Sequence, residues 1–302
     1  MRRTLCLALL AAATPTAALG QTAKKEPPPM LTTAAVQSRE AVFKRTPQGD
    51  LVMHLYLPPD WKASDRRPAI IFFFGGGWSG GSHVQFIPQA RYLASRGLVA
   101  ACADYRIASK HKTTPDVCVE DAKSAIRWLR GKAPELGIDP DKVIASGGSA
   151  GGHLAAATAL VPGFDAATDD RKISCKPNAL VLFNPALNLE GRSMKGADGS
   201  DVAKAISPTL FLDQTLPPTI IFFGTADRLL PQGEEFLTKA KTLGRRVELW
   251  TAADMPHSFF NRSPWLEVTT RKMDEFLAGL GYLSGSPTVA LPAGAGELKK
   301  VD

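Results

Sequence analysis

Histidine and paired cysteines, the usual protein ligands of zinc, are scarce in this sequence. Five histidines are spread over 302 residues, and no group of cysteines and histidines has the spacing of a zinc-binding motif. We therefore expect no metal ion.

Long hydrophobic runs are absent too, so no membrane span is predicted. The N-terminal apolar run Leu5–Ala13 is too short to cross a bilayer; it follows Arg2-Arg3 and precedes the small residues of Ala18–Gly20. This order is typical of a cleaved signal peptide over residues 1–20, with Gln21 as the new N-terminus. No cysteine stands just after the run, which argues against a lipid anchor. We expect a secreted or periplasmic protein.

Charge of one sign is nowhere concentrated. The formal net charge of +7 comes from basic pairs scattered along the chain. Nucleic-acid-binding proteins gather such residues into one stripe, so no nucleic-acid partner is expected. The oligomeric state leaves no signal in the sequence.

Strand and helix patterns alternate along residues 39–283, which predicts one α/β domain. We expect a mostly parallel, eight-stranded twisted sheet with helices on both faces and no large cap domain. Apolar runs such as Pro218–Phe223 are typical of parallel strands buried on both faces, and Asp116–Gly131 has clear helical spacing. The strands are expected near residues 41–45, 51–57, 68–74, 98–103, 142–147, 179–183, 218–223 and 246–250.

The segments outside this domain are expected to be irregular. Residues 21–38 are polar and proline-rich, which predicts a flexible lead-in, and residues 284–302 are rich in Gly, Pro and Ala, which predicts a disordered tail. Within the domain, the long connection 184–216 could form a wall or lid of the substrate pocket.

Three cysteines remain after the signal peptide, an odd number that leaves at least one unpaired. Cys102 lies in an apolar strand pattern and should be buried. A disulfide between Cys118 and Cys175 stays open, although the expected topology places these two at opposite faces of the domain.

Gly147-Gly-Ser-Ala-Gly151 carries the strongest chemical signal. A strand pattern precedes it and the Ala-rich helix pattern Gly152–Leu160 follows it. Such a strand–turn–helix presents the serine hydroxyl on a strained turn, and the glycines let neighbouring elements approach closely. Ser149 is therefore the candidate nucleophile.

A serine nucleophile needs a histidine base and an acid that orients the histidine. His257 follows the strand pattern Arg246–Trp250, and Asp227 follows Pro218–Phe223, so both lie where α/β proteins place their chemistry. Asp227 could instead cap the helix that follows it, and Asp254 is the nearest rival. We assign His257 as the base and Asp227 as the acid.

The other histidines have simpler interpretations. His54 lies in an alternating strand and is interpreted as a surface residue, and His111 lies in a charged loop and should be solvated. His153 is too close to Ser149 in sequence to act as its base, so we interpret it as a packing residue. His83 follows a glycine-rich loop and could line the cleft.

An oxyanion hole is the remaining requirement for acyl transfer. Gly75-Gly-Gly-Trp78 directly follows a strongly apolar strand. The N–H groups of Gly76, Gly77 and Ala150 could then stabilise charge on a carbonyl oxygen.

These segments resemble the α/β-hydrolase superfamily, in particular its carboxylesterase branch of hormone-sensitive-lipase-like and acetyl- or feruloyl-esterase-like enzymes. The resemblance is carried by Phe74–Trp78, Asp104–Arg106, Gly137–Lys142, Gly147–His153, Gly224–Asp227 and Pro256–Phe259. The family loop usually begins with histidine where Phe74 stands here, so the bracing of this loop should differ. Little sequence precedes the first strand, so the helical cap of lipase-like relatives is expected to be missing.

The resemblance implies an exported serine carboxylesterase that acts on short-acyl or hydroxycinnamoyl esters of carbohydrates without a cofactor. Two alternatives remain: an amidase or peptidase of the same fold, and a non-catalytic binding module. Candidates for the cleft wall are Trp78, His83, Leu187, Phe211, Phe259 and Phe260.

Overall fold

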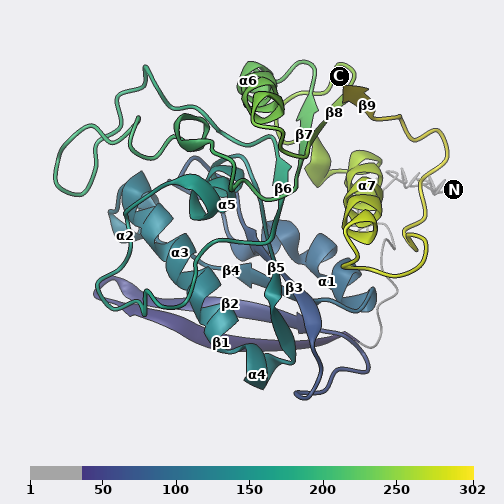
Figure 1. Cartoon of the computed structure of the whole chain (residues 1–302), viewed down its shortest axis with the longest axis horizontal. Coiled ribbons are helices and arrows are strands. Elements are labelled where there is room, and N and C mark those ends of the chain that lie inside the picture. The colour runs from purple at the N-terminus through teal and green to yellow at the C-terminus, as the bar shows by residue number, and fades with distance from the viewer. Residues whose placement is uncertain (1–35) are drawn as a thin grey trace, which may run out of the picture.

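The computed structural model describes residues 36–302 and centres on a twisted, mostly parallel sheet (Figure 1). Within these residues the sheet has nine strands, in the order β1-β2-β4-β3-β5-β6-β7-β8-β9. The strands are β1 (Gln37–Thr46), β2 (Gly49–Leu57), β3 (Arg67–Phe73), β4 (Val99–Ala103), β5 (Ile138–Gly148), β6 (Ala179–Phe183), β7 (Thr219–Gly224), β8 (Val247–Ala252) and β9 (Lys299–Val301).

Six neighbouring strands, β4, β3, β5, β6, β7 and β8, run parallel, whereas the pairs β1–β2, β2–β4 and β8–β9 are antiparallel. The carboxyl ends of the parallel strands therefore share one edge of the sheet. This edge is where open α/β sheets bind ligands. The predicted α/β fold is confirmed, with one strand more than expected.

Helices cover both faces of the sheet (Figure 1). Helices α1 and α7 pack on one face, and α3, α5 and α6 pack on the other. The helices are α1 (Ile87–Ser95), α2 (Ala108–His111), α3 (Pro115–Gly131), α4 (Ala133–Leu136), α5 (Ala150–Leu160), α6 (Leu230–Thr242) and α7 (Trp265–Gly279), with short 3₁₀ turns η1 (His83–Phe86), η2 (Pro208–Phe211) and η3 (Phe259–Asn261). No helix in the described part of the chain is long and apolar enough to cross a membrane.

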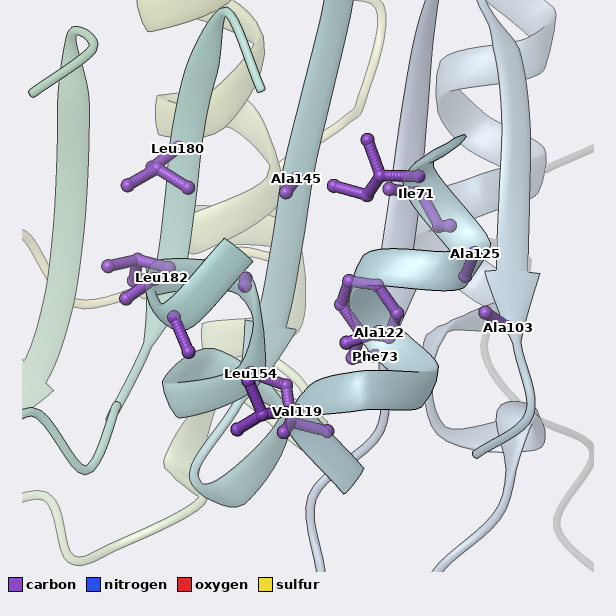
Figure 2. Packing of buried hydrophobic residues seen from close by; sticks show 14 of the residues in the cluster. Ile71, Phe73, Ala103, Val119, Ala122, Ala125, Ala145, Leu154, Leu180 and Leu182 are labelled. Atoms are coloured by element: carbon purple, nitrogen blue, oxygen red, sulfur yellow. The ribbon is translucent and has the colours of Figure 1, made fainter. Parts of the chain in front are cut away.

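Successive residues of the central strands point to opposite faces, so a continuous apolar run fills two core layers. Ile71 and Phe73 of β3 enter the layer beneath α3 and α5, where Val119 and Leu154 also lie (Figure 2). Phe72 enters the opposite layer beneath α1 and α7. The two core layers hold the parallel strands, and the loops at their ends, in fixed positions.

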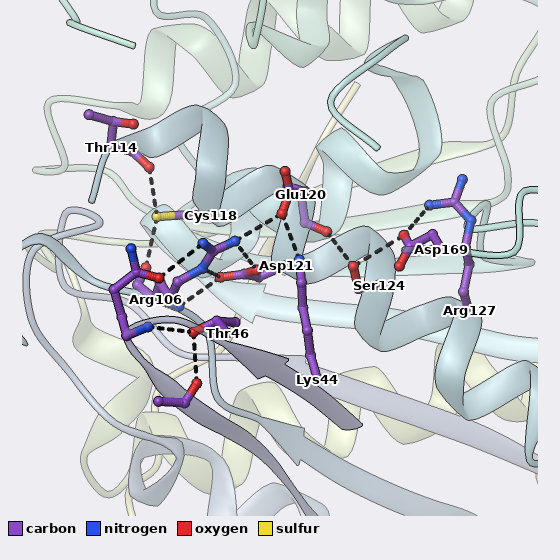
Figure 3. Close-up of polar contacts among 12 residues, drawn as sticks. Lys44, Thr46, Arg106, Thr114, Cys118, Glu120, Asp121, Ser124, Arg127 and Asp169 are labelled. Atoms are coloured by element: carbon purple, nitrogen blue, oxygen red, sulfur yellow. Dashed lines mark hydrogen bonds and ion pairs between the residues drawn. The ribbon is translucent and has the colours of Figure 1, made fainter. Parts of the chain in front are cut away.

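A buried ionic cluster fastens the segment after β4 to helix α3 (Figure 3). Arg106 donates to both carboxylate oxygens of Asp121, at 2.8 and 2.7 Å, and to Glu120 at 2.9 Å. Lys44 of β1 donates to the same two carboxylates. Asp121 is fully buried, and a buried charge is tolerated when it is paired and hydrogen-bonded in this way.

The C-terminal tail differs from the disordered segment that its composition predicted. Residues 299–301 form β9 against β8, and Val289 is buried. Arg96 donates to the carbonyl groups of Ser284 and Gly285, and Tyr92 accepts a hydrogen bond from the Thr288 N–H. Gly and Pro abound here because the segment turns repeatedly over the surface between these anchor points.

At the other end, β1 begins at Gln37. The last two residues of the segment 21–38, which was expected to be a flexible lead-in, therefore belong to a strand. The predicted signal peptide, residues 1–20, lies outside the described residues. Cys102, Cys118 and Cys175 are all free thiols. Cys118 donates to the Arg106 carbonyl oxygen, so the Cys118–Cys175 disulfide that the sequence left open is not formed.

Candidate active site

Ser149 occupies the turn between β5 and α5 in a conformation that few residues adopt. Its φ of 53° and ψ of −116° lie in a sparsely populated region, and such backbone strain clusters at functional sites. The Ser149 N–H donates to the Phe183 carbonyl oxygen at 2.8 Å, and its own carbonyl accepts the His153 N–H at 2.9 Å. The surrounding backbone therefore holds the strained turn.

The turn also depends on the close approach of α5 to β3. A Cβ atom added at Gly151 would lie 2.0 Å from the carbonyl oxygen of Phe73, well inside van der Waals contact. Only glycine fits at this position. Gly151, two residues after the serine, thus sets the distance between the nucleophile and the neighbouring strand.

His257 joins Ser149 to Asp227. Its Nε2 atom lies 2.9 Å from the Ser149 hydroxyl oxygen, and its Nδ1 atom lies 2.8 Å from Asp227 Oδ2. Because Asp227 can only accept at neutral pH, Nδ1 carries the proton and Nε2 is left to accept from the serine hydroxyl. The structure thus brings the three residues together in the order that nucleophilic catalysis requires.

Asp227 is buried and held by three donors. Burial by itself raises the pKa of this carboxyl, but hydrogen bonds from His257, the Leu229 N–H and Asn184 outweigh it, and the net pKa lies below its ordinary value. The Asn184 amide donates to Oδ2, the same oxygen that accepts from His257. Asp227 therefore stays ionised at neutral pH and fixes the orientation of the imidazole.

The glycine-rich loop after β3 lies beside the nucleophile. A Cβ atom built at Gly75 would lie 3.4 Å from Ser149 Cβ. Gly76 has a φ of 132°, and a Cβ there would collide with the Gly80 carbonyl oxygen at 2.2 Å. Among the described residues, the N–H groups of Gly76 and Gly77 have no hydrogen-bond acceptor. Ala150, as the first residue of α5, has no acceptor within its own helix.

The bracing of this loop replaces the family histidine by other contacts. Phe74 stacks on Tyr105 at a ring-centroid distance of 4.1 Å, and the Tyr105 hydroxyl donates to the Phe74 carbonyl oxygen. The Gly75 N–H donates to Gln85 Oε1 at 2.6 Å, and the Gln85 amide in turn donates to Asn261. The loop is thereby tied to η1 and η3.

His153 is a packing residue, as its sequence position suggested. It is fully buried, accepts a hydrogen bond from Trp78 Nε1 and donates to the Ile206 carbonyl oxygen. Burial lowers its pKa to about 4, despite the raising effect of the bond to Ile206. His153 is therefore uncharged at neutral pH and ties the glycine-rich loop to the 184–216 connection.

Several residues predicted to line the cleft lie in the core instead. Leu187 and Phe260 are fully buried, Phe259 and Trp78 nearly so, because each packs against a neighbouring aromatic ring or core layer. Phe211 is half-buried on η2.

The remaining histidines also differ from expectation. His83 stacks on His54 at a centroid distance of 3.4 Å, and His54 is 9% exposed instead of lying on the surface. His111 is 8% exposed: it is the last residue of the short helix α2, and its Nδ1 atom accepts the N–H of Ile107, the residue before that helix.

Four supporting residues were missed by sequence reasoning: Gln85, Tyr105, Asn184 and Asn261. Tyr105 is the middle residue of Asp104-Tyr-Arg106, a segment noted only for its resemblance. Asn184 directly follows a buried strand, at the same edge as Ser149 and Asp227, and this placement is a signal that could have been used. No sequence pattern indicated a supporting role for Gln85 or Asn261.

Comparison with known proteins places the chain in a family. Residues 53–190 match the family model described as BD-FAE. The chain is 24% identical over 253 residues to the esterase LipQ of Mycobacterium tuberculosis, covering 78% of this chain and 60% of LipQ. It is 31% identical over 136 residues to the carboxylesterase NlhH of the same species, covering 45% of this chain and 41% of NlhH. The chain thus spans about half the length of these curated relatives.

The similarity to a solved structure is more extensive. The chain is 46% identical to esterase 2 of Thermogutta terrifontis, in a structure phosphonylated by cyclosarin, with a TM-score of 0.79. The alignment covers 82% of this chain and 96% of that esterase. Another structure of the same esterase, bound to butyrate, is 43% identical with a TM-score of 0.77, covering 84% of this chain and 98% of the other. The chain therefore belongs to the carboxylesterase branch of the α/β-hydrolase superfamily.

Proposed function

We propose that this protein is an exported serine carboxylesterase that hydrolyses short-acyl esters through Ser149, His257 and Asp227. The observation that carries the proposal is the continuous hydrogen-bonded chain from Asp227 through His257 to the Ser149 hydroxyl, 2.8 and 2.9 Å long at its two links. A serine hydroxyl paired with a base in this way is an activated nucleophile.

The proposed reaction proceeds in two halves. In the first, Ser149 Oγ attacks the ester carbonyl carbon while His257 Nε2 takes the hydroxyl proton, and the ionised Asp227 stabilises the resulting imidazolium. The N–H groups of Gly76, Gly77 and Ala150 hold the oxyanion. The carbon–oxygen ester bond then breaks as the imidazolium returns its proton to the leaving alcohol, which leaves an acyl group on Ser149.

In the second half, His257 takes a proton from water, and the hydroxide attacks the acyl-enzyme. The tetrahedral intermediate collapses, Ser149 regains its proton from His257, and the carboxylic acid leaves. Every proton in this cycle passes through His257 Nε2, so the reaction needs no cofactor.

A small acyl group is the expected substrate feature. Thermogutta esterase 2, which aligns over nearly its whole length, has been obtained with butyrate and with propionate bound. No inserted cap domain interrupts the strands among residues 36–302. We further propose acetyl or hydroxycinnamoyl esters of carbohydrate as the natural substrates, supported by the predicted export signal and by the family resemblance.

Hydrolysis of p-nitrophenyl esters from acetate to laurate tests the proposal. We expect activity to be highest between acetate and butyrate, and Ser149→Ala to lower turnover by roughly 10⁶-fold. Ser146→Ala is the matched control: this serine lies three residues earlier in β5, and its buried hydroxyl has no hydrogen-bond partner among the described residues. Its loss should leave turnover unchanged.

Two further outcomes would move the assignment elsewhere. Equal activity of Ser149→Ala and wild type would remove the proposed nucleophile, and cleavage of aminoacyl anilides in preference to esters would favour the amidase alternative. Acetylated and feruloylated xylan then test the carbohydrate, and N-terminal sequencing of exported protein tests cleavage before Gln21.

A further inference from the structure

Three side chains that can bind a metal ion converge beside the neighbouring strands β2 and β4, outside the triad. They are His54 in β2, His83 in η1 and Asp104, which directly follows β4. One ligand atom from each lies within 4.8 Å of the other two. His54 Nε2 and His83 Nδ1 each lie 3.5 Å from a different oxygen of Asp104.

The hydrogen bonds of His54 leave one ring nitrogen without a partner. Its Nδ1 lies 2.9 Å from the Glu40 carboxylate, so the proton of the neutral ring belongs on Nδ1. Nε2 is then a bare lone pair that faces a carboxylate oxygen. Within residues 36–302 this buried nitrogen has no hydrogen-bond partner. Two acceptors facing each other repel, and a cation between them would turn that repulsion into attraction.

The two imidazoles lie against each other beside Asp104. Their centroids are 3.4 Å apart and their planes differ by 21°. Neutral imidazole is the form of histidine that binds a metal ion.

We propose that His54, His83 and Asp104 bind a divalent transition-metal ion, with zinc as the best match. Two imidazole nitrogens and one carboxylate oxygen are the ligand chemistry of zinc, whereas magnesium and calcium prefer oxygen ligands alone. Glu40 occupies the position of the outer carboxylate that commonly orients a metal-binding histidine.

The site is accessible and can adjust to an ion. His54, His83 and Glu40 line an open groove of about 610 Å³, which also contains Arg39 and Arg91. Zinc–ligand distances of about 2.0–2.2 Å require the three ligand atoms to move closer together. The His83 side chain is 26% exposed and sits on a single 3₁₀ turn, so it has room to rotate.

Metal binding at this place would also reach the glycine-rich loop. Gln85, which accepts the Gly75 N–H, lies two residues after His83 in the same short turn η1. An ion held by His83, His54 and Asp104 would fasten η1 to β2 and to the end of β4. The proposed ion is thus a structural support for the loop and takes no part in bond cleavage.

Zinc titration of chelator-treated full-length protein tests this site. We expect one zinc ion per chain by isothermal titration calorimetry and by metal analysis after gel filtration, no comparable binding of magnesium, and a higher thermal midpoint with zinc. Glu40→Gln should weaken zinc binding by about 10–100-fold, because the outer carboxylate is lost. His83→Asn and Asp104→Asn should abolish stoichiometric binding.

His111→Asn is the matched control, since it removes a histidine outside the cluster and should leave zinc affinity unchanged. His83→Asn and Asp104→Asn change partly exposed side chains, and circular dichroism verifies that these variants fold. Failure of the wild type to bind zinc would overturn the proposal. So would zinc binding of unchanged affinity and stoichiometry in His83→Asn and Asp104→Asn, which would indicate adventitious surface binding.

Discussion

His153 shows how a single buried side chain couples stability to pH. Its pKa is lowered from an ordinary 6.5 to about 4 by burial, so the unfolded chain binds a proton more readily than the folded one. Stability therefore falls as the pH drops from about 6.5 towards 4, and it is fully present above the unfolded pKa. The imidazole contributes this dependence without any role in proton transfer.

We expect wild type to lose about 1.5 kcal/mol more stability than His153→Gln between pH 6.5 and pH 5, since stability changes by at most about 1.4 kcal/mol per pH unit between the two pKa values. Urea unfolding at the two pH values measures this difference. Glutamine can still accept from Trp78 but does not titrate, and other ionisable groups cancel in the comparison. The same pH dependence in both proteins would contradict the assignment.

The residues of the site differ in how far the sequence predicts them. Ser149, Asp227 and His257 each follow a recognisable strand, and the sequence order alone suggests their roles. Asn184 donates to Asp227, which lies 43 residues away in the sequence, and Gln85 accepts from Gly75, ten residues away. A polar residue that works by one distant hydrogen bond leaves no periodic pattern, so only the folded chain reveals it.

At the scale of elements, the close contact between Gly151 of α5 and Phe73 of β3 determines the position of the nucleophile. We expect Gly151→Ala to destabilise the protein by about 1–3 kcal/mol or more, because the new methyl group overlaps the Phe73 carbonyl oxygen unless the helix moves. Turnover of p-nitrophenyl acetate should fall as well, since such a movement displaces Ser149.

Chemical denaturation and ester hydrolysis measure both effects. Gly80→Ala is the control for stability: it also adds one methyl group, but nothing lies within 4 Å of it. A Gly151→Ala variant as stable and as active as wild type would show that α5 and β3 accommodate the methyl group without loss of stability or turnover.

Helices and strands with a regular apolar pattern could be predicted from the sequence, whereas a strand that forms only by pairing with a neighbouring strand could not. The helix expected over 116–131 is observed as α3, Pro115–Gly131, because its apolar residues recur at helical spacing. Strand β9, with the sequence Lys-Lys-Val, has no such signal. It forms because the backbone of β8 offers unpaired groups at the edge of the sheet.

At the scale of the whole molecule, the C-terminal tail, residues 284–302, covers the edge strand β8 and part of the core. Removal of residues 284–302 would uncover the β8 edge, expose the surface beneath Val289 and take two carbonyl acceptors from Arg96. We expect the shortened protein to lose about 2 kcal/mol or more of stability, roughly the contribution of one buried valine side chain.

Thermal and urea unfolding of the shortened and complete chains test this expectation. Lys300→Ala provides the control, because it keeps the backbone pairing of β9 and changes only an exposed side chain. If the two chain lengths unfold at the same midpoint, the tail contributes no stability.

The close contact of Gly151 with Phe73 also bears on how the gene can change. Every single-nucleotide missense change in a glycine codon yields an amino acid that carries a Cβ atom, and here that atom would meet a backbone oxygen at 2.0 Å. Every such change therefore carries at least the stability cost expected for Gly151→Ala. Substitutions in the loops around the nucleophile avoid this contact.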